Sequence, residues 1–158
     1  DFLSLRIQGG KEFGFESGWK LSPRVEVAYN HVNIDSYDES GSVAALSVAS
    51  QSYETLELGL GLEIAKPIVV EKAVWTPYFD LAVYHDFADD QVQSNSRFVI
   101  GGNSFVTTGS DVEQTNISAT LGLSYSVGAN HSLKAAYEYF GNSSYDSASW
   151  MLRYSYGF

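Results

Sequence analysis

The sequence predicts an all-β protein whose antiparallel strands form a transmembrane barrel. Three features predict it: apolar and polar residues alternate along most of the chain, the alternating stretches are long, and short and long connections separate them. Alternation at a period of two places one set of side chains on each face of a strand. A tilted strand that crosses a bilayer needs about 9–11 residues, whereas strands of soluble proteins usually have about 5–6. Strand length therefore favours a membrane barrel over a soluble sandwich.

About seven strands fit this pattern. We expect them, in chain order, at residues 3–7, 19–29, 54–64, 74–87, 115–127, 133–139 and 149–158. The first strand is short and depends on Leu3, Leu5 and Ile7. The last is the clearest, because large apolar residues such as Trp150 and Leu152 share one parity and small or polar residues share the other.

The strands between them repeat the alternation with different residue types. In 19–29, valines alternate with arginine, glutamate and alanine, and in 54–64 leucines alternate with glycine and glutamate. In 74–87, tryptophan, phenylalanine and leucine alternate with threonine, aspartate and tyrosine. In 115–127, apolar residues alternate with serine, threonine and glycine, and 133–139 is a weaker case.

The polar parity carries charges of both signs. A membrane barrel turns this face to its interior and the apolar face to lipid, although a soluble sheet with one wet face would show the same alternation. The glycines Gly59 and Gly61 lie on this parity and leave room for a neighbouring ring. The residues that we expect to face the interior are Arg24, Glu26, Glu57, Glu63, Asp80, Tyr84, Lys134, Glu138 and Arg153.

The connections also fit a barrel. Outer-membrane barrels have short periplasmic turns and longer external loops. If the chain ends in the periplasm, as bacterial barrels usually do, the second, fourth and sixth connections lie outside, and the long connection is one of them. The expected connections are 14–18, 36–42, 65–73, 88–112, 128–131 and 141–144, of which 65–73 is long for the periplasmic side.

Aromatic side chains mark the expected membrane interfaces. Amphipathic rings collect at both headgroup levels of a bilayer. We expect Trp19, Trp75 and Tyr125 at the periplasmic interface, with Tyr154, Tyr156 and Phe158 at the end of the last strand. The rings expected at the outer interface are Tyr29, Phe87, Tyr139 and Trp150.

Composition excludes several classes of function. The chain has no cysteine, so it has no disulfide, thiol nucleophile or cysteine metal site. Its net charge of −10 argues against nucleic acid as a partner. The three histidines lack metal-site spacing, and the acidic pairs Asp38–Glu39 and Asp89–Asp90 are typical of solvated loops rather than calcium sites. We therefore expect no enzyme activity, no metal and no cofactor.

An odd number of strands cannot close an antiparallel ring. Each unpaired backbone group in lipid costs several kcal/mol, so an open sheet edge is not stable there. One interpretation adds an eighth strand within 92–107 and gives a small closed barrel with a structural or adhesive role. The other treats the chain as the C-terminal portion of a larger barrel, which the abrupt start and the missing signal peptide favour.

Several motifs resemble the autotransporter β-domain of type V secretion. Their order and spacing are more specific than any motif alone, and together they cover essentially the whole chain. They are Gly18-Trp19-Lys20-Leu21-Ser22-Pro23, Tyr37-Asp38-Glu39-Ser40-Gly41, Trp75-Thr76-Pro77-Tyr78, Tyr84-His85-Asp86-Phe87 and the ending Leu152-Arg153-Tyr154-Ser155-Tyr156-Gly157-Phe158.

The resemblance implies a bacterial outer-membrane barrel of 12 strands with a helix in its pore, which carries an N-terminal passenger to the cell surface. Residues 1–158 would hold about the last seven strands of that barrel. The implied partners are outer-membrane lipid, the barrel assembly machinery, the passenger and the pore helix. The interior charges would then hold the helix or shape a conduit, unless they only pair with one another. The implied assembly signal is Trp150, Leu152, Tyr154, Tyr156 and Phe158.

Overall fold

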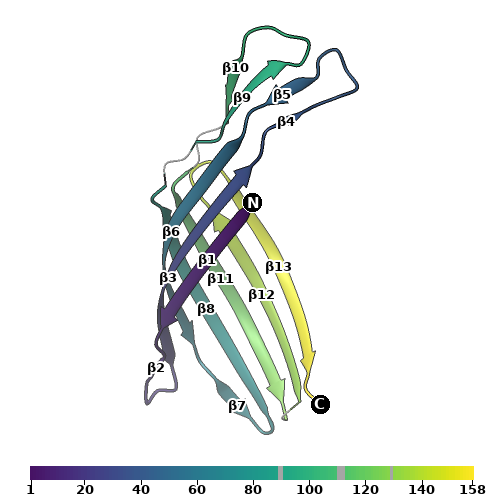
Figure 1. The fold of residues 1–158 in the computed structure, drawn as a ribbon. Coiled ribbons are helices and arrows are strands. Elements are labelled where there is room, and N and C mark those ends of the chain that lie inside the picture. The colour runs from purple at the N-terminus through teal and green to yellow at the C-terminus, as the bar shows by residue number, and fades with distance from the viewer. Residues whose placement is uncertain (89–90, 110–112, 129) are drawn as a thin grey trace. The chain divides into compact units, whose positions relative to one another are not determined.

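The computed structural model is all-β and antiparallel, as the alternation predicts (Figure 1). It describes residues 1–88, 91–109, 113–128 and 130–158. Among these residues, no helix is long and apolar enough to span a membrane. The chain forms two compact units. We call Gln8–Glu26, Leu58–His85 and Thr115–Phe158 the wall unit, and Asp1–Ile7, Val27–Glu57 and Asp86–Gln114 the loop unit.

The main sheet contains all seven predicted strands in the order β1-β3-β6-β8-β11-β12-β13, with the short strands β2 beside β3 and β7 beside β8. Most strands are longer than the alternation suggested, and β1 and β13 stand at the two ends of the order. Their bounds are β1 Phe2–Gly10, β2 Phe13–Gly14, β3 Lys20–Ile34, β6 Gln51–Ala65, β7 Ile68–Val70, β8 Ala73–Asp86, β11 Thr115–Val127, β12 His131–Gly141 and β13 Asp146–Tyr156.

In the wall unit, the polar face of the sheet is buried and the apolar face is exposed, the reverse of a sheet in a soluble protein. Small and polar residues form the buried face, where Tyr78 is 8% exposed and Ala136 is 2% exposed. The apolar face is open, and Leu121 is 63% and Tyr154 62% exposed. Soluble proteins bury such side chains in a core. An outer-membrane barrel instead turns this face to lipid, so the burial pattern decides between the two interpretations of the alternation.

The predicted medium connection at 65–73 is wrong, because most of it is a β-hairpin. Strand β7 pairs with the start of β8, with Val70 opposite Ala73. Only Glu71 and Lys72 remain in the turn, and Glu71 takes a left-handed conformation with φ 53°. The alternation is interrupted at Pro67, which has no N–H to donate to a ladder. The turn is therefore short, as on the periplasmic side of other barrels.

The loop unit contains a second, four-stranded sheet that the sequence did not predict. Its order is β10-β9-β5-β4, and it is built from two connections of the main sheet. The predicted loops 36–42 and 88–112 are wrong in this respect, because the first contains one strand, with another soon after it, and the second contains two. The four strands are β4 Tyr37–Asp38, β5 Leu46–Val48, β9 Gln93–Phe98 and β10 Phe105–Thr108.

This second sheet excludes the eighth wall strand that a small closed barrel needed from residues 92–107. Strand β9 pairs with β10 on one side and with β5 on the other, where Phe98 lies opposite Leu46. The amide of Val99 also donates to the carbonyl of Ala45 at 2.9 Å. The rings of Phe98 and Phe105 pack with centroids 5.9 Å apart. The segment thus belongs to the loop sheet and not to the main sheet.

We predict that Leu121→Arg in the full-length protein lowers the free energy of unfolding in phospholipid vesicles by about 2–4 kcal/mol, the cost of a cation at mid-bilayer depth. Equilibrium urea unfolding measures the change. Ser149→Arg, which lies on the polar face of β13, is the matched control and should have little effect. Equal, small effects of both substitutions would contradict a lipid-facing position for Leu121.

Candidate functional site on the polar face

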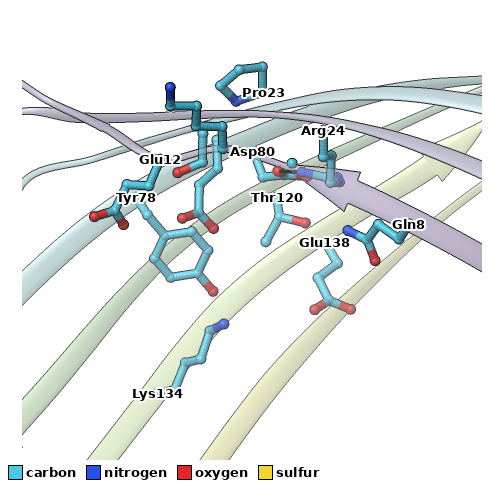
Figure 2. Close-up of a pocket in the computed structure, with 13 residues that line it drawn as sticks. Gln8, Glu12, Pro23, Arg24, Tyr78, Asp80, Thr120, Lys134 and Glu138 are labelled. Carbon is cyan, nitrogen blue, oxygen red and sulfur yellow. Dashed lines mark hydrogen bonds and ion pairs between the residues drawn. The ribbon is translucent and has the colours of Figure 1, made fainter.

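The polar face of the wall unit holds a cavity of about 520 Å³ (Figure 2). Strands β1, β3, β6, β8, β11 and β12 all contribute lining residues. The predicted interior residues Arg24, Glu63, Asp80, Lys134 and Glu138 line it. Polar side chains from several strands thus line one cavity.

An ion pair crosses one whole strand of this wall. Arg24 on β3 donates from Nη2 to Oδ1 of Asp80 on β8 at 2.8 Å, and its Nη1 donates to Oδ2. Strand β6 lies between them in the strand order. The guanidinium passes over Gly61, where an added Cβ would lie 2.5 Å from the Arg24 Cζ. A larger side chain at this position would therefore force the guanidinium of Arg24 to move from this path. The fork geometry makes this the strongest kind of carboxylate contact.

Two tyrosine rings lie across glycines in the same way. Tyr84 covers Gly59, where an added Cβ would be 2.7 Å from the ring. Tyr78 covers Gly122, which stands directly opposite it on β11. The predicted room for a ring is confirmed at Gly59, while at Gly61 the occupant is the guanidinium. The sequence did not point to Gly122, because the partner ring lies 44 positions away and only the strand register brings them together.

Tyr78 is the centre of the small core of the wall. It packs with Ala65 and Ala136, and Met151 packs against them. The ammonium of Lys134 lies over the ring, 4.6 Å from its centroid. Among the described residues, the buried Tyr78 hydroxyl has no hydrogen-bond partner. Figure 2 shows the ring and Lys134 near one another at the cavity wall.

The other predicted interior residues lie on the same parity. Glu26 is buried at 9% exposure and its Cβ lies beside Gly59. Arg153 stands opposite Lys134 on β13. Glu57 lies on β6 within the loop unit, so it is not part of the wall-unit cavity.

The predicted interfacial rings form clusters on the apolar face of the wall unit. Trp75 packs on Tyr125 with centroids 4.5 Å apart, and Lys66 lies over the Trp19 ring at 5.2 Å. Tyr154 and Tyr156 both pack on His131.

The four rings predicted at the outer level are placed as follows. Tyr29, in the loop unit, donates its hydroxyl to Glu54 at 3.2 Å. Phe87 also lies in the loop unit, just after β8. Tyr139 lies opposite Ala148, which is two residues from Trp150 along β13 and on the same face. Trp150 itself shares a row with Tyr137, Leu121 and Phe79, so it lies mid-strand and not at the outer end as expected.

Metal chemistry has no support in the described part of the chain, where no cluster of histidine and carboxylate side chains could hold an ion. Asp89 and Asp90, the acidic pair considered for calcium, lie outside the described residues.

A sequence profile described as autotransporter beta-domain matches residues 1–138. The chain belongs to the autotransporter β-domain family. It is therefore an outer-membrane β-barrel protein with a translocator role, located in the bacterial outer membrane. The resemblance of its motifs to this family is confirmed.

Three curated relatives are similar to parts of the chain. The uncharacterized protein in the trpE-trpG intergenic region of Pseudomonas putida is 30% identical over 95 residues, 59% of this chain and 16% of that protein. Esterase EstA of Pseudomonas aeruginosa is 28% identical over 125 residues, 78% of this chain and 19% of EstA. Pertactin autotransporter of Bordetella parapertussis is 26% identical over 139 residues, 87% of this chain and 14% of pertactin. The chain thus spans less than a fifth of each relative.

Among solved structures, the attachment invasion locus protein Ail of Yersinia pestis aligns with 98% of this chain and 93% of its own, at 13% identity and a TM-score of 0.33.

We predict that Gly122→Ala lowers the free energy of unfolding by about 1–3 kcal/mol, because the new methyl group overlaps the Tyr78 ring. Unfolding in vesicles measures it. Gly9→Ala is the matched control, since a Cβ there meets nothing within 4 Å. Adding Tyr78→Ala should make Gly122→Ala nearly neutral; a full loss in that background would rule out the overlap as the cause.

A double-mutant cycle tests the ion pair across β6. We expect Arg24→Gln and Asp80→Asn each to cost about 1–3 kcal/mol, since each leaves a partly buried partner without its charge-assisted bonds. The double variant should cost less than the sum of the two. Additive losses would show that the two side chains do not stabilise each other in the membrane.

Proposed function

We propose that this chain forms part of the barrel that carries an N-terminal passenger to the cell surface. Family membership supports the translocator class, and the exposed apolar face with its buried polar face supports a channel-forming wall. The passenger itself, its activity and its cleavage belong to the whole protein, of which the chain matches only a small share in its relatives.

The geometry of the polar face supports a conduit. Arg24, Tyr84 and Tyr78 lie flat along the wall, over Gly61, Gly59 and Gly122, instead of projecting into the cavity. A long polar side chain that stood upright would reduce the bore of a barrel, whose interior is already narrow at low strand numbers. The glycines therefore keep space for a polypeptide while the charges stiffen the sheet.

We further propose that the barrel assembly machinery inserts this protein by binding β13. The outward stripe of this strand is among the most exposed apolar surfaces of the wall unit: Trp150 is 82% and Leu152 73% exposed. Phe158 follows just beyond the strand end. A continuous aromatic and leucine stripe at the sheet edge is accessible for pairing with another protein's strand.

Transport, and not catalysis, is the role that we propose for these residues. EstA is named an esterase, but the chain corresponds to 19% of its length. Arg24 and Asp80 form an ion pair across the wall, an arrangement typical of structural bracing. If the purified full-length protein hydrolyses esters, we expect the activity to be lost when the passenger is removed. Substitutions in the wall should leave the activity unchanged.

We expect Phe158→Ala to reduce insertion into the outer membrane of cells several-fold while it leaves refolding of the full-length protein in detergent almost unchanged. The side chain is fully exposed, so it contributes little to the stability of the folded sheet. Heat-modifiable migration of the protein from membranes and from refolding mixtures measures both. Phe13→Ala, an exposed ring at the opposite edge, serves as the control. Equal losses in cells and in detergent would contradict a role in recognition.

Surface protease digestion of intact cells tests the translocator proposal itself. A passenger of the wild-type protein that is digested from outside supports it. A passenger that stays protected while the barrel is folded in the membrane would overturn it.

A further inference from the structure

The loop unit has a cavity of its own, of about 300 Å³, at the four-stranded sheet whose strands are labelled β4, β5, β9 and β10 in Figure 1. Two of its lining residues stand opposite one another, Ser47 on β5 and Arg97 on β9. Asn95, two residues before Arg97 on the same strand, lies on the same face and also lines the cavity. Ser36 directly precedes β4 and Ser104 directly precedes β10, and both complete the lining. Side chains at all four strands are thus gathered around one space.

The lining of this cavity is rich in hydrogen-bond donors. A guanidinium has five N–H donors and no acceptor, an asparagine amide has two N–H donors, and each serine hydroxyl has one. None of the described lining residues is an aspartate or a glutamate. Such a surface suits a ligand that carries several acceptor oxygens and a negative charge.

Arg97 has no carboxylate partner, although the loop unit is acidic. Arg6 and Arg97 are the only lysine or arginine residues in the sequence of this unit, where aspartate and glutamate are much more frequent. Among the described residues, Arg97 forms neither an ion pair nor a side-chain hydrogen bond. Asp38 lies on the same row but on the far side of Ser47, and it does not line the cavity. The guanidinium fork of Arg97 is therefore available to an anion from outside the chain.

We propose that this cavity binds a phosphate group, carried by a soluble sugar phosphate or by the phosphorylated headgroup of a lipid. The fork of Arg97 takes two of the phosphate oxygens. The hydroxyls of Ser47 and Ser104 come from the two strands that flank β9, so they can donate to the oxygens that remain. A carboxylate has only two oxygens, which the fork alone would occupy. The cavity is larger than one phosphate, which leaves room for a sugar beside Asn95 and Ser36.

Isothermal titration calorimetry with glucose 1-phosphate tests the site. The full-length protein is refolded in a non-ionic detergent that contains no phosphate. We expect saturable binding that Arg97→Gln weakens by about tenfold or more, because the charge-assisted hydrogen bonds are lost. Ser47→Ala should weaken it several-fold. Lys72→Gln, an exposed position in the β7–β8 turn of the wall unit, removes the same charge elsewhere and should leave the affinity unchanged.

A second arm distinguishes the two sources of the phosphate. Mixed micelles that contain diphosphoryl lipid A, a phosphorylated glycolipid, are compared with micelles of detergent alone. Weaker binding of glucose 1-phosphate in the mixed micelles assigns the site to a lipid headgroup, and unchanged binding assigns it to a soluble sugar phosphate.

Three results would overturn the proposal: no saturable binding of glucose 1-phosphate at millimolar concentrations, equal binding of unphosphorylated glucose, or the same loss of affinity with Lys72→Gln as with Arg97→Gln. Heat-modifiable migration checks that each variant is folded. Arg97→Lys keeps the charge without the fork, so it should retain part of the affinity; complete loss in Arg97→Lys would contradict binding through the charge. The site is independent of the proposed transport, because surface digestion of the passenger should be the same in Arg97→Gln and in the wild type.

Discussion

The fold depends on one constraint: in lipid, every backbone N–H and C=O must find its partner within the protein. Long antiparallel strands meet this constraint with ladder hydrogen bonds, so side chains are not needed to hide the backbone. The apolar side chains are then free to face outward, where acyl chains replace water. This explains why Leu121 and Tyr154 are open while Tyr78 and Ala136 are the buried residues of the wall unit.

Because the buried face is the polar one, its packing uses different means from a soluble core. Alanines, glycines and flattened long side chains replace interlocking leucines. The ring of Tyr78 covers Gly122, and the guanidinium of Arg24 covers Gly61 on its way to Asp80. Each contact joins neighbouring or next-neighbouring strands, so the same groups that pack the face also brace the sheet sideways.

Much of this could be predicted from the sequence, and the limits have physical causes. Period-two alternation over ten or so residues identifies the wall strands as strands, because a helix would repeat its apolar residues every three or four positions. The strands of the loop sheet have only two to six residues, which is too short for alternation to be visible. The β7–β8 hairpin was missed because Pro67 interrupts the alternation and β7 has only three residues. Parity placed Arg24 and Asp80 on one face, but only the strand order shows that they meet across β6.

The two kinds of cation on this face show how strand order and register decide the state of a charge. Arg24 reaches a carboxylate two strands away because the residue between them is a glycine, which leaves a path along the wall. Lys134 has an aromatic ring on one side and a second cation on the other, and the rows next to it contain hydroxyl and apolar groups. The first charge is neutralised within the sheet, so it contributes to the rigidity of the wall. The second lies over an aromatic ring and beside another cation, so it is held by the polarisable face of Tyr78 rather than by a carboxylate.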